Sequence, residues 1–357
     1  MNLETKLLAM LVHRRTIGAE VARDAIASGA PGRFLVQHGV CTAEQWEQWL
    51  RTDGGARPVL SRYELGDALG QGAVGRVFAA VDKIGNQRVA VKVLRPELAR
   101  DPVQTERFVK EAKLLQELQH SNIVKGLRVA REGEQIFFAM ELVAGECLQD
   151  VLAERGRLDE ETALQIVVDV ASALDALHDR GLVHRDVKPG NILWSPERGA
   201  VLIDLGFALQ QSDQASSSDT TAGTVHYIAP EQARGSGQLD VRADIYALGA
   251  TLYHLTTGSL PFEGRTSEEV LAKQVLESLS GQRIRALQLS PQLHYFLEKM
   301  MAKDPAMRFQ NPKQLQVEIR AFLEQRRHQR EVEAQMQKQQ PRLGDLRARA
   351  EERRRRR

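Results

Sequence analysis

Hydrophobic and polar positions change their spacing near residue 60 of this 357-residue chain. Before that point apolar residues recur at helical intervals, which predicts short helices over residues 1–50. Thr42 and Gln45 fit a capping box, in which a hydroxyl and an amide satisfy two free backbone N–H groups. The helix that follows has an apolar face made of Trp46, Trp49 and Leu50. We expect a helical N-terminal extension at 1–50 and a linker at 51–60, where two glycines and a proline occur.

After Tyr63 the apolar residues are often β-branched and occur in short runs, which predicts strands. The predicted strands lie at 77–81, 89–94 and 135–143. The predicted helices lie near 103–118 and near 160–179. Gly85-Asn86 supplies the turn between the first two strands, Asp159 caps the second helix, and Gly181 fits its left-handed end. The order predicts an α+β fold with two lobes, a small β-rich one followed by a larger helical one, and a cleft between them.

Composition narrows the class of protein only slightly. A hydrophobic content of 42% and a charged content of 27% are typical of globular proteins, and a net charge of +2 argues against a polyanion-binding surface over the whole molecule. Cys41 and Cys147 form neither a disulfide framework nor a metal set. We expect a cytoplasmic protein, because the sequence shows no signal-peptide pattern and no apolar run of membrane-spanning length.

The C-terminal residues 326–357 form a basic tail, with 12 Lys and Arg against 5 Asp and Glu. Few apolar residues interrupt it, which favours a solvated helix or a disordered segment over a packed domain. Binding of nucleic acid or an anionic membrane surface is the functional alternative, and we prefer the solvated tail.

The octapeptide at 184–191 carries a carboxylate, a cation and an amide at fixed spacing: Asp186, Lys188 and Asn191. Phosphoryl transfer from a nucleotide needs a group that orients a hydroxyl, a charge that neutralises phosphate, and a ligand for Mg²⁺. Asp204, directly after the apolar run 201–203, adds a second oxygen ligand of the kind that Mg²⁺ prefers. On its own the octapeptide is equally consistent with a polar turn.

Upstream, Gly70, Gly72 and Gly75 form a G-x-G-x-x-G pattern. A dinucleotide-binding turn would need a helix straight after the glycines, but a strand follows here, which favours a flap that covers the phosphates of ATP. Lys92 lies among apolar strand residues, so its charge needs a partner. Glu111 falls on the apolar face of the predicted helix and is the natural one.

Together these motifs resemble the protein kinase superfamily, and most closely the bacterial, eukaryotic-like (Hanks-type) serine/threonine protein kinases. The resemblance covers the chain from near Ser61 to near Leu323. It rests on the glycine-rich loop, Val89-Ala90-Val91-Lys92, Glu111, the octapeptide at 184–191, Asp204-Leu205-Gly206, Ala229-Pro230-Glu231, Asp244–Gly249, and Lys303-Asp304-Pro305 with Arg308-Phe309. Leu205 departs from the usual phenylalanine, and its smaller side chain could pack more loosely between Leu115 and His184.

The resemblance implies ATP and Mg²⁺ as cofactors and proteins with Ser or Thr acceptors as substrates. The expected catalytic residues are Asp186, Lys188, Lys92 and Glu111, with Asn191 and Asp204 holding the metal. The expected ATP-binding residues are Gly70, Gly72, Gly75, Val77, Ala90, Lys92, Met140, Glu141, Val143 and Leu193. Thr224, Glu231 and Arg308 are expected to build the substrate platform, and Asp244 to brace the catalytic loop. Lys188 is typical of Ser/Thr kinases.

The polar stretch at 205–223 is rich in Ser and Thr, so it is either a flexible linker or an activation loop. Arg185, beside the catalytic aspartate, is the expected receiver of a phosphate. We predict autophosphorylation at Thr220 or Thr221, which allows for self-association and reaction between copies.

We expect a protein kinase domain at 61–325, with an N-lobe at 61–143 and a C-lobe at 144–325. Two alternatives share this fold. A pseudokinase scaffold would bind nucleotide or partners with little catalysis, and the presence of Lys92, Asp186, Asn191 and Asp204 argues against it. A small-molecule kinase related to aminoglycoside phosphotransferases would generally lack the Ala-Pro-Glu platform that begins at Ala229.

Overall fold

The computed structural model describes residues 3–13, 16–43, 45–46, 58–205, 209–210, 225–235, 239–279 and 289–339. The chain divides into two compact units, residues 1–65 and residues 66–357. The described helices contain no segment that is both long enough and apolar enough to span a membrane.

The first unit has a small hydrophobic core of its own. Its helices are α1 (Leu3–His13), α2 (Ala19–Ala27) and α3 (Pro31–Gln37). Leu7, Leu8 and Leu35 are fully buried in this core, and Trp46 is 7% exposed. The capping box is confirmed: the Thr42 N–H donates to Gln45 Oε1 (2.9 Å), and the Gln45 N–H donates to Thr42 Oγ1 (3.1 Å). Trp49, Leu50 and linker residues 51–57 lie outside the described residues.

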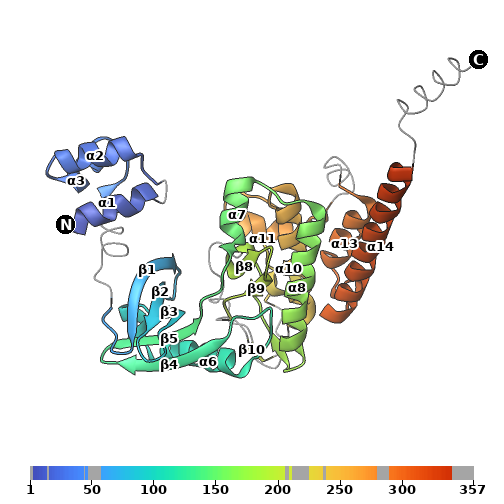
Figure 1. Ribbon diagram of the computed structural model, residues 1–357, viewed down its shortest axis with the longest axis horizontal. Helices are drawn as coiled ribbons and strands as arrows, with labels where there is room; N and C mark the ends of the chain where they lie inside the picture. The colour runs from blue at the N-terminus through green and yellow to red at the C-terminus, as the bar shows by residue number, and fades with distance from the viewer. Residues whose placement is uncertain are drawn as a thin grey trace, which may run out of the picture. The chain divides into compact units, whose positions relative to one another are not determined.

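A five-stranded sheet in the order β1-β2-β3-β5-β4 forms the strand-rich part of the chain (Figure 1). Its strands are β1 (Tyr63–Gln71), β2 (Gly75–Asp82), β3 (Gln87–Leu94), β4 (Gly126–Glu132) and β5 (Gln135–Glu141). β3 pairs antiparallel with β2 on one side and β5 on the other, and it is buried from Val89 to Leu94. β5 ends at Glu141 rather than at 143, because Glu141 with Val89 is its last pair in the β3 ladder.

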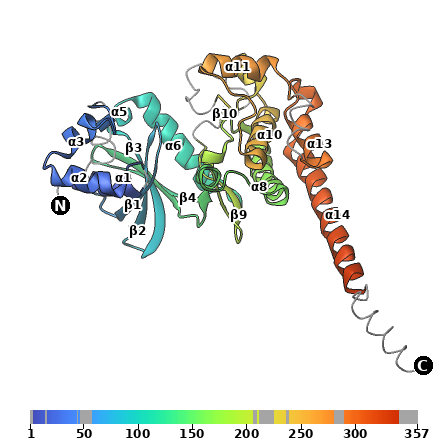
Figure 2. The ribbon, with the colours of Figure 1, turned by 90° about the horizontal axis from the view of Figure 1, so that it is seen from above.

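Helix α6 (Pro102–Glu117) contacts β4 and β5 of this sheet and follows the short helix α5 (Pro96–Ala99). Figure 2 shows α6 beside the strands. Asp101 caps its first turn by accepting from the Val103 N–H (2.9 Å). The residues it buries, Phe108, Glu111, Ala112 and Leu115, recur at helical spacing. One buried face of α6 therefore carries three apolar residues and one carboxylate.

The larger part of the second unit is mainly helical. Its helices are α7 (Leu148–Arg155), α8 (Glu160–His178), α9 (Pro230–Ala233), α10 (Val241–Thr257), α11 (Ser267–Leu276), α13 (Pro291–Met300) and α14 (Pro312–Gln339), with single 3₁₀ turns η1 (Pro189–Asn191) and η3 (Pro305–Met307). Its short strands are β6 (Glu146–Cys147), β7 (Leu182–Val183), β8 (Ile192–Ser195), β9 (Gly199–Leu202) and β10 (Leu209–Gln210). Both predicted ends of α8 are confirmed, since Asp159 accepts from the Thr162 N–H and Gly181 has a φ of 68°.

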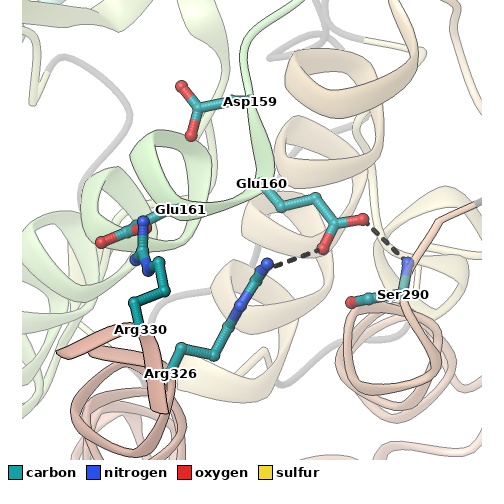
Figure 3. Close-up of a pocket in the computed structure, with 6 residues that line it drawn as sticks. All are labelled: Asp159, Glu160, Glu161, Ser290, Arg326 and Arg330. Carbon is teal, nitrogen blue, oxygen red and sulfur yellow. Dashed lines mark hydrogen bonds and ion pairs between the residues drawn. The ribbon is translucent and has the colours of Figure 1, made fainter. Parts of the chain in front are cut away.

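Helix α14 runs without a break through residue 326, where the sequence predicts the start of the tail. Figure 3 shows how its arginines meet the acidic first turn of α8. Arg326 pairs with Glu160 (3.6 Å), Arg330 pairs with Glu161, and Glu160 also accepts from the Ser290 N–H (2.8 Å). Ion pairs thus hold the first turn of the expected tail against α8, and residues 340–357 lie outside the described residues.

Candidate active site

Lys92 lies on the central strand β3 and joins three elements. Its Nζ donates to both carboxylate oxygens of Glu111 on α6 (2.9 and 3.2 Å) and lies 3.4 Å from Asp204 Oδ2. The Lys92 and Glu111 side chains are only 10% and 4% exposed, so neither charge is well solvated. The predicted Lys92–Glu111 pair is therefore present, and the cation also reaches the aspartate that follows β9.

Burial and charge act in opposite directions on this cluster. Burial on its own lowers the pKa of Lys92, but the carboxylates of Asp204 and Glu111 outweigh it, so the pKa is raised. Burial raises the pKa of Glu111 to about 7, against the lowering effect of Lys92. Lys92 therefore stays protonated at neutral pH, while Glu111 titrates near neutrality.

The octapeptide folds so that its three functional side chains meet. Asp186 Oδ2 lies 2.8 Å from Lys188 Nζ and accepts from Asn191 Nδ2 (2.9 Å). The same Asn191 amide donates to the Asp186 carbonyl (2.8 Å). Asp186 and Asn191 are buried and Lys188 is partly exposed. A carboxylate held on one oxygen by a cation and an amide has a fixed orientation.

Asp244, near the start of the buried helix α10, holds the backbone of this loop. Its two oxygens accept from the N–H groups of His184 (2.8 Å) and Arg185 (2.7 Å). Arg185 has a φ of 69°, a left-handed conformation that an L-residue adopts only when its surroundings impose it. The bracing that the resemblance implies for Asp244 is confirmed, and it stabilises a strained turn immediately before Asp186.

The chain also brings Asn191 and Asp204 close together. β8 and β9 pair antiparallel, and the Ile203 N–H donates to the Asn191 carbonyl (3.0 Å) where this pairing ends. The amide nitrogen of Asn191 donates to Asp186, and its carbonyl oxygen Oδ1 is the atom that can coordinate a metal. Among the described residues there is no cluster of three or more His, Cys, Asp or Glu with metal-ligand geometry. One carboxylate and one amide oxygen fit Mg²⁺, which takes its other ligands from phosphate and water.

The glycine-rich turn joins β1 to β2, so the strand after the glycines is confirmed. Gly75 is required by close approach, since a Cβ there would lie 2.3 Å from the Val93 carbonyl oxygen. A Cβ at Gly70 or Gly72 would meet no described atom within 4 Å. These two glycines leave space beside the turn, as a phosphate-covering flap requires.

Two of the expected adenine-binding residues are neighbours in the sheet, since Ala90 and Met140 are direct partners across β3 and β5. Ala90, Met140 and Val143 belong to the large hydrophobic cluster of the second unit, and Val77 and Leu193 pack against it. Sequence reasoning missed a second feature here, a bidentate ion pair between Glu141 and Arg198, which lies in the turn between β8 and β9. Its hydrogen bonds to Arg198 lower the pKa of Glu141.

Glu231 and Arg308, both expected in the substrate platform, form an ion pair. Arg308 donates from two nitrogens to the two carboxylate oxygens of Glu231 (2.6 and 2.8 Å), and its side chain is 0% exposed. Beside Glu231, Gln232 Nε2 donates to the Arg185 carbonyl (3.2 Å), which links α9 directly to the loop at 184–191. Thr220, Thr221 and Thr224 lie outside the described residues.

Leu205 is 1% exposed and belongs to the same buried cluster as Leu115. It is therefore packed in the core despite its smaller size. Sequence reasoning also missed Gln274, which is fully buried on α11. A signal was available, because Gln274 lies four residues after the buried Val270 and so falls on the apolar face of that helix.

Comparisons with known proteins agree with this geometry. Residues 63–318 match the family described as "Protein kinase domain". The chain is 37% identical over 272 residues to "Probable serine/threonine-protein kinase PknB" of Corynebacterium glutamicum, covering 73% of this chain and 42% of the relative. It is 38% identical over 264 residues to "Serine/threonine-protein kinase PknB" of Mycobacterium leprae, covering 72% and 42%. The chain thus spans about two fifths of the length of these relatives.

Proposed function

The chain belongs to the protein kinase family, and from that premise we propose that it transfers the γ-phosphoryl group of ATP to serine and threonine hydroxyls of proteins. The observation that carries the proposal is the position of Lys92, whose Nζ contacts both Glu111 and Asp204. A pseudokinase would not need to hold a phosphate-binding cation and a metal-binding aspartate together. The buried Glu231–Arg308 pair supports a protein acceptor over a small molecule.

In this mechanism Asp186 orients the acceptor hydroxyl and takes up its proton. Its Oδ2 is held by Lys188 and Asn191, which fixes the orientation of the carboxylate that takes up the proton. Lys188, at 21% side-chain exposure, neutralises charge on the transferring phosphoryl group. Lys92, positioned by Glu111, binds the α- and β-phosphates.

Mg²⁺ held by Asn191 and Asp204 would neutralise negative charge that develops on the phosphate oxygens during transfer. The residues of the chain contribute alignment and a fixed electrostatic environment. Lys188 favours serine and threonine over tyrosine as acceptor. Acid hydrolysis of the labelled product tests this assignment: phosphoserine and phosphothreonine are expected, and phosphotyrosine alone would contradict it.

The pKa of Glu111 predicts a pH dependence. The ordinary value is 4.5 and the folded value is about 7, so the folded chain keeps a proton that the unfolded chain has lost. The stability contributed by this proton is complete below 4.5 and is lost as the pH rises through 7. The ionised Glu111 carboxylate, which positions Lys92, forms as the pH rises through 7.

We therefore expect kcat/KM for ATP to rise about tenfold between roughly pH 6 and pH 8, the span over which a single group near pH 7 ionises. Glu111→Gln cannot ionise, so its rate should be lower and nearly flat over this range. This variant also controls for the titration of ATP itself. An equal pH slope in both proteins would show that Glu111 does not titrate there.

Autophosphorylation at Thr220 or Thr221 is the proposed activating event, with Arg185 as the receiver of the phosphate. Mass spectrometry of wild-type protein incubated with ATP should find phosphate on one of these residues, and the Asp186→Asn protein should carry none. Thr220→Ala combined with Thr221→Ala should lower the rate on an added acceptor. An active enzyme that stays unmodified between residues 205 and 223 would refute this event.

A further inference from the structure

A described segment begins at Val225, directly after the platform residue Thr224. A side chain of helix α11 donates hydrogen bonds to the first two carbonyls of this segment. Gln274 Nε2 donates to the carbonyls of His226 (2.7 Å) and Val225 (3.3 Å). Gln274 is 0% exposed. A buried polar side chain aimed at two backbone acceptors orders that stretch of backbone, because leaving either carbonyl unsatisfied is costly.

The same side chain continues into a directional chain of hydrogen bonds. Gln274 Oε1 accepts from the Tyr246 hydroxyl (2.6 Å), and that hydroxyl accepts from Lys303 Nζ (2.9 Å). The direction follows from the end groups: the ammonium can only donate and the carbonyl oxygens can only accept, so the hydroxyl between them accepts from one and donates to the other. Burial raises the pKa of Tyr246, so the hydroxyl keeps its proton at neutral pH. The order Lys303, Tyr246, Gln274, then backbone is thus fixed by chemistry.

Lys303 closes the arrangement. Its Nζ also donates to the Gln274 backbone carbonyl (2.7 Å) and lies 4.3 Å from the centre of the Phe262 ring. The guanidinium of Arg308, which donates to Glu231, lies 4.9 Å from the centre of the Tyr246 ring. The aromatic side chain of Tyr246 is therefore shared by two cations that anchor the two ends of the segment 225–231.

We propose that Gln274, Tyr246 and Lys303 form a second anchor of the substrate platform and set the affinity of the enzyme for its protein acceptor. The proposal rests on the proposed kinase function, because it concerns the same platform. The Glu231–Arg308 pair holds the far end of the segment, and the triad holds the end that continues into Thr224. Because Gln232 joins this segment to the catalytic loop at Arg185, a shift at Val225 and His226 moves the acceptor relative to Asp186.

A purely structural role for the triad predicts a different kinetic result. Lower stability reduces the amount of folded enzyme and hence kcat, but the KM of each substrate is unchanged. A positioning role raises the KM for the acceptor and leaves the KM for ATP alone, since none of the three residues belongs to the expected ATP site. The informative result is therefore whether the KM for the acceptor rises while the KM for ATP stays the same.

The test uses full-length protein, with the Asp186→Asn copy of the chain as the acceptor because it cannot label itself. Tyr246→Phe removes one hydroxyl and keeps the ring beside Arg308, and Lys303→Met removes the cation. From the usual contribution of one to two buried hydrogen bonds, each should raise the acceptor KM by about threefold to tenfold, with the KM for ATP within about twofold.

Lys299→Met is the matched control. Lys299 also donates to a tyrosine hydroxyl, that of Tyr295 (2.8 Å), and lies 4.0 Å from the centre of the Phe309 ring, but its other hydrogen bond goes to Glu318 (3.0 Å), which lies outside the triad. Its acceptor KM should equal that of wild type. The proposal is overturned if both test variants keep the wild-type acceptor KM, or if the control rises equally. If wild type labels neither itself nor the acceptor, the proposed kinase function is overturned, and the platform proposal with it.

Discussion

Replacing Asp186 by asparagine should lower kcat about a thousandfold, within the range usual for loss of a general base. The amide oxygen can still accept from Lys188 and Asn191, which now contact Asp186 Oδ2 at 2.8 and 2.9 Å, so the loop should keep its shape. What is lost is the negative charge and the site for the acceptor proton. The KM for ATP should change little, because Asp186 is not assigned to the nucleotide.

Single-turnover transfer to an added protein acceptor measures this effect free of product release. Asp179→Asn is the control, since Asp179 is an exposed aspartate just after α8 with no assigned role. It should retain the wild-type rate. An Asp186→Asn protein with more than about a tenth of the wild-type rate would remove Asp186 from the role of base.

Arg308→Met should lower the free energy of unfolding of the second unit by about 3–5 kcal/mol, the usual cost of removing one partner from a buried ion pair. The Arg308 side chain has no exposed surface, and it donates to Glu231, to the Ala302 carbonyl (2.7 Å) and to the Arg242 carbonyl (2.8 Å). Methionine fills part of the volume and satisfies none of these acceptors. The far end of the platform should therefore loosen as the unit loses stability.

Arg242 provides a matched control within the same region. It pairs with Asp240 at 2.6 Å, but the two side chains are 29% and 40% exposed. Solvated pairs contribute little, so Arg242→Met should cost less than about 1 kcal/mol. Urea unfolding followed by circular dichroism compares the two variants. Similar losses in both would mean that burial does not set the value of the Arg308 pair.

Much of the fold and site could be predicted because the chemistry restricts residue types at fixed spacing. The strand around Lys92 and the apolar face around Glu111 each required a partner for a buried charge, and the structure joins the two. The caps at Thr42 and Asp159 were predictable for a similar reason, since free N–H groups at a helix start are satisfied locally.

Long-range side-chain bonds without a motif could not be predicted. Gln274 and Lys303 meet only because α11, α10 and the segment after α13 pack together, and nothing in the spacing of the sequence encodes that meeting. The Glu141–Arg198 pair is similar, because its partners are 57 residues apart and belong to separate hairpins. The ion pair of Arg326 with Glu160 could not be predicted either. In the sequence Arg326 is one residue of a charged run, and only the fold brings it close to Glu160.

Lys92, Glu111, Asp186 and Asp204 are proposed to form a working phosphoryl-transfer site. Wild type, Lys92→Met and Asp186→Asn proteins, incubated with radiolabelled ATP and Mg²⁺, test it most directly when covalent label on the chain is counted after denaturation. Wild type should be strongly labelled, chelation of the metal should abolish this labelling, and both variants should be labelled only near background. Equal labelling of all three proteins would contradict it.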